Sequence, residues 1–263
     1  MRRLIPGVIA ALLLCAVAGC GSNPTGPGSG ALNQQNADDM AIQAVSGLVV
    51  LGGEVQVMLG STPAAPQARA RRAAPARAMW DTTVTANGIT YEASRTFYDA
   101  LDNELPSYGP LAVRMRWTGR AHGNYQGPRD TASVGHATVL DVRGIQSAQD
   151  TVRLDGTCND TLQISFRSLD GLRHRWFYWT SGVTVDAVRI LKSTFDTAGW
   201  PISGTVTYLV SADRLRSNSR TDVDAHFDAT VVVVFNGTSQ PVVVVNGSYY
   251  YHWNMQTGAI TRT

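Results

Sequence analysis

The chain has 263 residues, and its 22 lysines and arginines nearly balance its 20 aspartates and glutamates, which leaves a formal net charge of +2. A charge this close to zero argues against binding of nucleic acid or of an anionic membrane surface by electrostatics alone. About 180 residues follow Trp80, which is ample for one hydrophobic core.

The first twenty residues have the pattern of a bacterial export signal. Arg2 and Arg3 precede an apolar stretch over 4–18, and the run Val17-Ala18-Gly19-Cys20 follows. This run resembles the lipobox of bacterial lipoproteins. A transmembrane helix is disfavoured because the stretch has about 15 residues, where about 20 are needed to span a bilayer. An ordinary secretory signal with an incidental cysteine is the other alternative.

The resemblance implies a compartment and a means of attachment. In that family the signal is removed before the cysteine, whose sulfur carries a diacylglyceryl group. Carried over to this chain, residues 1–19 are the signal peptide, Cys20 is the lipidated first residue of the mature chain, and 20–32 include a Gly-, Ser- and Pro-rich tether. Gly21 stands where aspartate would favour the inner membrane, so the outer membrane is the expected location by analogy.

The lipobox also decides what the cysteines and charges can do. Cys15 leaves with the signal and Cys20 is acylated, so only Cys158 remains and no intrachain disulfide forms. Removal of Arg2 and Arg3 leaves the mature chain without net charge. Cys158 lies in the run 155–160, Asp-Gly-Thr-Cys-Asn-Asp, which predicts a turn between strands. No histidine is near Cys158 in the sequence, so a catalytic thiol is disfavoured.

Residues 33–60 predict one helix. Asn36 is the expected N-cap, Asp38 and Asp39 fall in the expected first turn, and apolar residues recur at helical spacing from Met40 onward. The pattern weakens at Gly52-Gly53, so 54–59 could continue the helix or turn to strand. Residues 61–79 form an Ala/Pro/Arg-rich segment, for which a solvated linker is favoured over a phosphate- or lipopolysaccharide-binding segment.

Residues 80–263 predict an antiparallel β domain. Two runs, 80–86 and 89–98, flank Asn87-Gly88, which is a strong hairpin signal. Asp170-Gly171, Asn236-Gly237 and Asn246-Gly247 supply further turns, although the last could be a bulge within a strand. The expected later strands are 111–119, 131–142, 151–154, 161–169, 174–180, 183–192, 202–211, 222–235 and 242–253.

Two of these strands are apolar on both faces, because 231–235 and 242–245 contain almost only valine. Such strands need a helix, a second sheet or a partner over each face. The helix at 33–60 is the only helical candidate to cover them. The expected fold is mainly β, a large antiparallel curved sheet or open barrel or sandwich with one N-terminal helix packed on it.

One strand carries polar residues at alternate positions, and it is the candidate metal site. Asp222, Asp224, His226 and Asp228 share one face, and carboxylates with an imidazole suit Ca²⁺ or Zn²⁺. Residues two apart on a strand are about 6.6 Å apart, too far to share one ion without a partner strand. A solvated face is therefore favoured over a metal site, and catalysis is the least favoured interpretation.

Aromatic residues form the candidate ligand site. Five of them, on two late strands, have a polar edge and could line a cavity for an apolar ligand, although core packing is favoured. They are Trp176, Tyr178, Tyr249, Tyr251 and Trp253.

No catalytic motif, phosphate-binding loop or dinucleotide-binding pattern is present in the sequence. The sequence predicts a lipid-anchored cell-envelope binding module without a cofactor, whose partner is an apolar ligand or an envelope protein and not nucleic acid. A structural lipoprotein with a filled core is the alternative, and a metal-dependent hydrolase using Asp222–Asp228 is disfavoured. No family resemblance is evident for the β domain.

Overall fold

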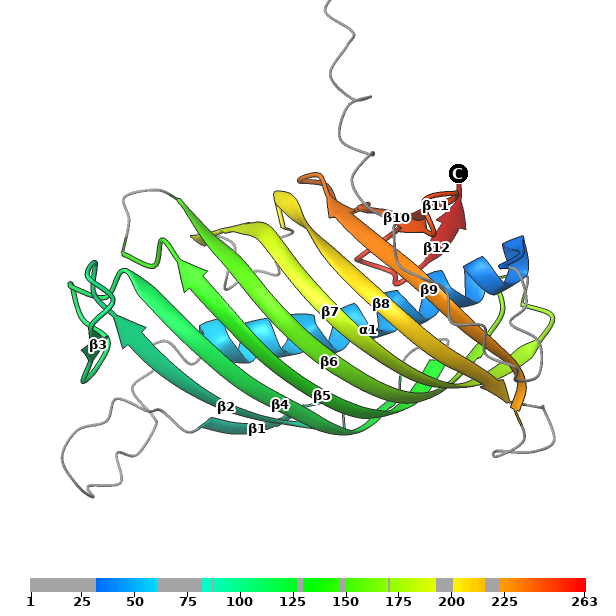
Figure 1. The fold of residues 1–263 in the computed structure, drawn as a ribbon, viewed down its shortest axis with the longest axis horizontal. Helices are drawn as coiled ribbons and strands as arrows, with labels where there is room; N and C mark the ends of the chain where they lie inside the picture. The colour runs from blue at the N-terminus through cyan, green and yellow to red at the C-terminus, as the bar shows by residue number, and fades with distance from the viewer. Residues whose placement is uncertain are drawn as a thin grey trace, which may run out of the picture.

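The computed structural model describes residues 32–60, 82–86, 88–126, 130–146, 150–169, 171–192, 201–215 and 223–263. Within them lie one helix, α1 (Gln34–Gly60), and one 12-stranded antiparallel sheet (Figure 1). The lipobox, Cys20, the tether and the Ala/Pro/Arg-rich segment lie outside the described residues.

The sheet is a meander in which nearly every strand pairs with the next one in the sequence. The order is β1-β2-β4-β5-β6-β7-β8-β9-β10-β11-β12, and β3 pairs separately with β2. Because β1 and β12 stand at opposite ends of this order, the sheet is open. The strands are β1 (Thr82–Ala86), β2 (Ile89–Tyr98), β3 (Glu104–Leu105), β4 (Arg114–Gln126), β5 (Asp130–Arg143), β6 (Thr151–Arg167), β7 (His174–Leu191), β8 (Ser203–Leu215), β9 (Val223–Phe235), β10 (Val242–Val245), β11 (Tyr249–Trp253) and β12 (Ile260–Arg262). The predicted fold class is confirmed.

The helix α1 crosses the strands along one face of the sheet, which we call the inner face (Figure 1). The other is the outer face. Inner-face side chains form the core, and Trp117, Trp179 and Tyr208 are almost completely buried there. On α1, Met40 and Ala44 are fully buried. The predicted packing of the helix on the sheet is confirmed, and α1 continues through Gly52-Gly53 to Gly60.

The start of α1 differs from the predicted one. The Asn36 amide donates to Asn33 Oδ1 at 2.9 Å, so Asn33 and not Asn36 is the N-cap. The helix consequently begins at Gln34, and Asp38 and Asp39 lie beyond its first turn. Instead of interacting with the helix dipole, they pair with arginines of the sheet: Asp38 with Arg262, and Asp39 with Arg175 at 3.6 Å.

The turn predicted at 155–160 is wrong. These residues lie inside β6, which pairs continuously with β5 over Arg153–Phe166 and carries a bulge between Leu154 and Gly156 in its pairing with β7. Cys158 is buried on the inner face, and its Sγ lies 3.0 Å from Thr138 Oγ1. Pairing with a strand on each side outweighs the turn preference of Asp, Gly and Asn. The same effect joins the expected strands 174–180 and 183–192 into β7.

Two of the predicted hairpin turns are confirmed, because the residues that favour a tight turn act on the backbone at the turn itself. Ala86 pairs with Ile89 around the first turn, where Gly88 has φ of +79° and a Cβ would lie 2.2 Å from the Asn124 carbonyl oxygen. Asn246 and Gly247 both have positive φ and join β10 to β11, so they form a turn and not a bulge.

The valine strands are covered on one face only within the described part of the chain. Val231, Val233, Val243 and Val245 are fully buried toward α1. Their outward neighbours are half-buried, and Val234 is 37% exposed. The helix thus covers one of the two strand faces that the sequence predicted to be covered. No helix in the described residues is long and apolar enough to span a membrane.

Candidate functional site

The sheet separates the five predicted ligand-binding aromatics between its two faces. Trp176 is half-buried and Tyr178 is 45% exposed, and both point outward from β7, whose Phe177 and Trp179 are buried inward. Tyr249, Tyr251 and Trp253 point inward from β11. The five side chains therefore do not line one cavity.

The inward group holds the N-terminal part of α1. The Tyr251 hydroxyl donates to Asp38 Oδ1 at 2.9 Å, and the Tyr249 hydroxyl donates to the Leu32 carbonyl oxygen at 2.7 Å. Burial raises the pKa of Tyr251, and the hydrogen bond to Asp38 raises it further. These two tyrosines thus fix the helix to the sheet.

The acidic strand, β9, is engaged in pairs with β8. Asp224 Oδ2 accepts from Arg214 Nε at 2.9 Å, and His226 Nδ1 lies 2.7 Å from Asp213 Oδ1. His226 Nε2 lies 3.4 Å from Asp228. Asp222 lies outside the described residues, and among those described no three His, Cys, Asp or Glu side chains are grouped as metal ligands. The hydrogen bond with Asp213 is the largest cause that raises the pKa of His226.

A polar cluster that the sequence did not reveal lies under the middle of α1. Strand register aligns His136, Asp160 and Ser181 across β5, β6 and β7, and the His136 ring bonds to Asp160. Ser181 Oγ donates to Asp160 at 3.3 Å and accepts from Trp179 Nε1 at 2.9 Å. All four side chains are buried.

This cluster is closed to substrate in the structure, because α1 approaches it directly. A Cβ on Gly47 of α1 would lie 3.5 Å from Asp160 Oδ2 and 3.4 Å from a ring carbon of Tyr208. Burial raises the pKa of the Tyr208 hydroxyl well above its usual value, and the nearby Asp160 and Cys158 raise it further. Because its side chains hydrogen-bond to one another and are buried, we interpret the cluster as a polar layer of the core.

A small cavity lies between α1 and the sheet, at the ends of β4 and β5. Its volume is about 70 Å³, and Ile42, Ser46, Tyr125 and Asp130 are among its lining residues. Ser46 Oγ donates to Asp130 Oδ2 at 2.5 Å, and burial raises the pKa of Asp130. Ligand cavities typically measure about 300–1,000 Å³. This cavity is large enough for one or two waters and too small for an acyl chain.

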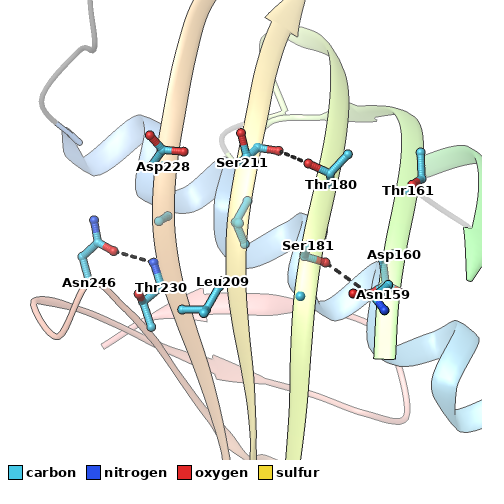
Figure 2. Close-up of a pocket in the computed structure, with 13 residues that line it drawn as sticks. Asn159, Asp160, Thr161, Thr180, Ser181, Leu209, Ser211, Asp228, Thr230 and Asn246 are labelled. Carbon is cyan, nitrogen blue, oxygen red and sulfur yellow. Dashed lines mark hydrogen bonds between the residues drawn. The ribbon is translucent and has the colours of Figure 1, made fainter. Parts of the chain in front are cut away.

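An open hollow lies on the outer face, over β6, β7, β8 and β9 (Figure 2). It has a volume of about 650 Å³. Strand register arranges its outward residues in two parallel rows, and Asn246 of the β10–β11 turn closes one end. The first row is Thr161, Thr180, Ser211 and Asp228, and the second is Asn159, Gly182, Leu209 and Thr230.

The hollow exists because its residues are small. A Cβ on Gly182 would meet no atom within 4 Å, and the first row consists of hydroxyl side chains and one aspartate. A third row borders it, formed by Gln163, Tyr178, Asp213 and His226. The predicted Tyr178, His226 and Asp228 thus meet at or beside one site, which the sequence did not group together.

Several polar groups of the hollow are already oriented by hydrogen bonds. Asn246 Oδ1 accepts from the Thr230 amide at 2.7 Å, and Thr180 Oγ1 donates to the Ser211 carbonyl oxygen at 3.4 Å. Both bonds appear in Figure 2, with α1 behind the strands. The Asn246 bond leaves its side-chain amide nitrogen available as a donor at the end of the hollow.

Comparison of the chain with protein-family models, with curated proteins and with solved structures gave no match.

Proposed function

We propose that the protein is a lipid-anchored cell-envelope binding module that engages an envelope partner through the outer face of β6–β9. The contrast between the two faces carries the proposal. The inner face is filled by α1 and retains a cavity of about 70 Å³, whereas the outer face carries a hollow of about 650 Å³. Acylation at Cys20 would hold the module at the membrane, with the outer membrane favoured by Gly21.

Of the two partner classes expected from the sequence, an envelope partner is favoured over an apolar ligand. An apolar ligand on the inner face would have to displace α1, whose Asp38 and Asp39 are paired with sheet arginines. Displacement would leave Arg175, whose side chain is 14% exposed, against an apolar ligand without its carboxylate, which is costly. The outer hollow is lined mainly by hydroxyl and amide groups, which do not favour an apolar molecule.

The first experiment tests the apolar ligand. The full chain is purified from its own membranes, and the organic extract is analysed by mass spectrometry. We expect no stoichiometric lipid beyond the acyl chains released chemically from Cys20. A non-covalent lipid at one per chain would contradict the proposal and favour a ligand on the inner face.

The second experiment tests the outer face in cells. A photoreactive residue is placed at Leu209, which is 63% exposed in the hollow, or at Thr118, an exposed outer-face residue of β4. We expect an envelope component to crosslink at Leu209 and not at Thr118, and the yield to fall in the Cys20→Ala variant, which lacks the anchor. Equal products from both positions would contradict a specific outer-face site.

A structural lipoprotein is the second candidate, and the filled inner face favours it. In that case the domain binds nothing at the hollow. Its own side chains fill the core, and the lipid anchor only tethers the domain to the membrane. Gly182→Gln, which places a side chain in the hollow, separates the two functions. A binding role predicts a lower crosslinking yield at Leu209, whereas a structural role predicts no specific crosslink there with or without the substitution and unchanged behaviour in cells.

A further inference from the structure

The lining of the outer hollow selects for a particular ligand chemistry. The described residues that line it include no lysine or arginine, so an anionic group would find no cationic side chain. Its charged lining residues are Asp228 and Asp160, and Asp160 is buried against His136, which leaves too few carboxylates for a cation. Ser181 is likewise buried and bonded to Asp160, so the remaining neutral donors and acceptors are three threonines, Ser211 and two asparagines.

The shape of the hollow selects for an elongated ligand. It crosses four neighbouring strands at right angles to their direction, and strands in a sheet are spaced about 4.8 Å apart. Polar side chains therefore repeat along the hollow at roughly the length of one sugar unit. Asn159 stands at one end, and Asp228 and Asn246 stand at the other.

Two exposed apolar surfaces accompany these polar groups. Leu209 is 63% exposed in the middle of the second row, and Tyr178 is 45% exposed in the bordering row. Tyr178 lies on the same strand face as Thr180, two residues away. An aromatic ring with a hydroxyl suits a molecule that has C–H faces and hydroxyl edges.

We propose that this hollow binds a neutral, polyhydroxylated chain, an envelope glycan, that lies across β6–β9. Hydroxyl and amide groups of the two rows hydrogen-bond the sugar hydroxyls. Tyr178 and Leu209 contact the C–H faces of the sugar rings. The inference rests on the proposed outer-face function and names the chemistry of the partner.

The test is direct binding to the full chain in detergent, measured by calorimetry and by co-sedimentation. The soluble probes are neutral oligosaccharides, including an N-acetylglucosamine hexamer and a dextran fragment, and the insoluble probe is peptidoglycan purified from the host. A Gly-Ser repeat peptide serves as the alternative chain, and inorganic phosphate as the anion. We expect binding of at least one glycan that changes little with salt, because no cationic side chain takes part.

Two substitutions connect binding to the hollow. Gly182→Gln places a side chain in the hollow, and we expect roughly tenfold weaker binding because the ligand must compete with it. Tyr178→Ala is expected to weaken binding about fivefold, whereas Tyr178→Phe keeps most of it, since the ring face is retained. Thr118→Gln adds the same side chain elsewhere on the outer face and should change nothing. Thermal unfolding of each variant confirms that the fold is intact.

The outcomes are distinct. If no glycan binds, or if Gly182→Gln binds as well as the unchanged chain, the inference is wrong. Binding of the Gly-Ser peptide without any glycan would make the hollow a peptide groove and overturn it equally. If glycans fail while crosslinking at Leu209 persists, the glycan assignment falls and the outer-face function stands. If no glycan binds and no specific crosslink forms at Leu209, both the glycan assignment and the outer-face function are wrong.

Discussion

His226 lies between two carboxylates on the outer face. Its Nδ1 is 2.7 Å from Asp213 and its Nε2 is 3.4 Å from Asp228, and the hydrogen bond with Asp213 contributes most to its raised pKa. We expect NMR titration of the imidazole to give a pKa above the ordinary value of about 6.5, and Asp213→Asn to lower it more than Asp228→Asn.

The sign of the pH effect follows from that shift. The protonated ring is stabilised in the folded state, so its contribution to stability is complete below about pH 6.5 and is lost as pH rises through the raised value. The contribution is small because the side chain is 36% exposed and the pair is screened by solvent. An unchanged titration in Asp213→Asn would show that the pair does not form in solution.

Asp38 allows a second test at the scale of the residue. Its carboxylate accepts from Tyr251 and from Arg262 Nε, each at 2.9 Å, and its side chain is 4% exposed. Asp38→Asn keeps the shape but removes the charge, and we expect it to lower the free energy of unfolding by about 1.5–3 kcal/mol in denaturant titrations.

The matched control is Asp102→Asn, because Asp102 also pairs with an arginine, Arg114, but is 76% exposed. A surface pair of this kind contributes about 0–1 kcal/mol. Equal losses in the two variants would contradict a special role for Asp38 in holding α1.

The sequence could not predict the contacts that hold the start of α1. Asn33 and Asn36 are both plausible N-caps, and a helix beginning at either would have a similar apolar pattern. The choice is made by Arg262 and Arg175, more than 130 positions away in the chain, which hold Asp38 and Asp39 beyond the first turn. Local propensity carries no information about such partners.

At the scale of the element, β6 shows where local signals mislead. Asp155, Gly156, Asn159 and Asp160 are all turn formers, yet they have four different roles in one strand. Asp155 accepts from Arg153 on the outer face, Gly156 sits at the bulge, Asn159 lines the hollow, and Asp160 is buried against His136. By contrast Gly88 and Gly247 do mark turns, because positive φ is a local requirement that the residue type reveals.

Gly156 provides the prediction at this scale. A Cβ there would lie 2.1 Å from the Val139 carbonyl oxygen and 2.9 Å from Leu140 Cα, so two backbones approach too closely for any side chain. We expect Gly156→Ala to lower the free energy of unfolding by about 2 kcal/mol or more, since strand β5 must shift. Denaturant titration or thermal unfolding measures it.

Gly135 is the control on the neighbouring strand. An added Cβ would lie 3.7 Å from the nearest atom, the Thr161 carbonyl oxygen, which is an ordinary contact. Gly135→Ala should be neutral or slightly stabilising, because alanine loses less backbone entropy on folding. Similar losses in both variants would show that the bulge is not the reason for glycine at position 156.

For the whole molecule, the sequence predicted the meander and the covering helix, because strand alternation and short turns determine both. It did not predict the outer hollow. Thr161, Thr180, Ser211 and Asp228 each look like ordinary outward residues of a half-exposed strand. Only the register of three successive strand pairs places them in one row. Register across several strands depends on turn lengths and bulges that a single sequence does not resolve.

Whether α1 is part of the core or a lid decides which face of the molecule can bind. Met40 and Ala44 are fully buried against the sheet, and lifting the helix would also separate Asp38 and Asp39 from their arginines. Exposing each large apolar side chain alone costs about 1.5–3 kcal/mol.

We therefore expect the amides of residues 37–51 to exchange with deuterium only when β6 and β7 do, measured by mass spectrometry on the full chain. The edge strand β1, whose Thr83, Val84 and Thr85 are exposed, should exchange much faster and serves as the reference. Exchange of α1 ahead of β6 and β7 would mean that the helix opens on its own, and would return the inner face to consideration as a site for an apolar ligand.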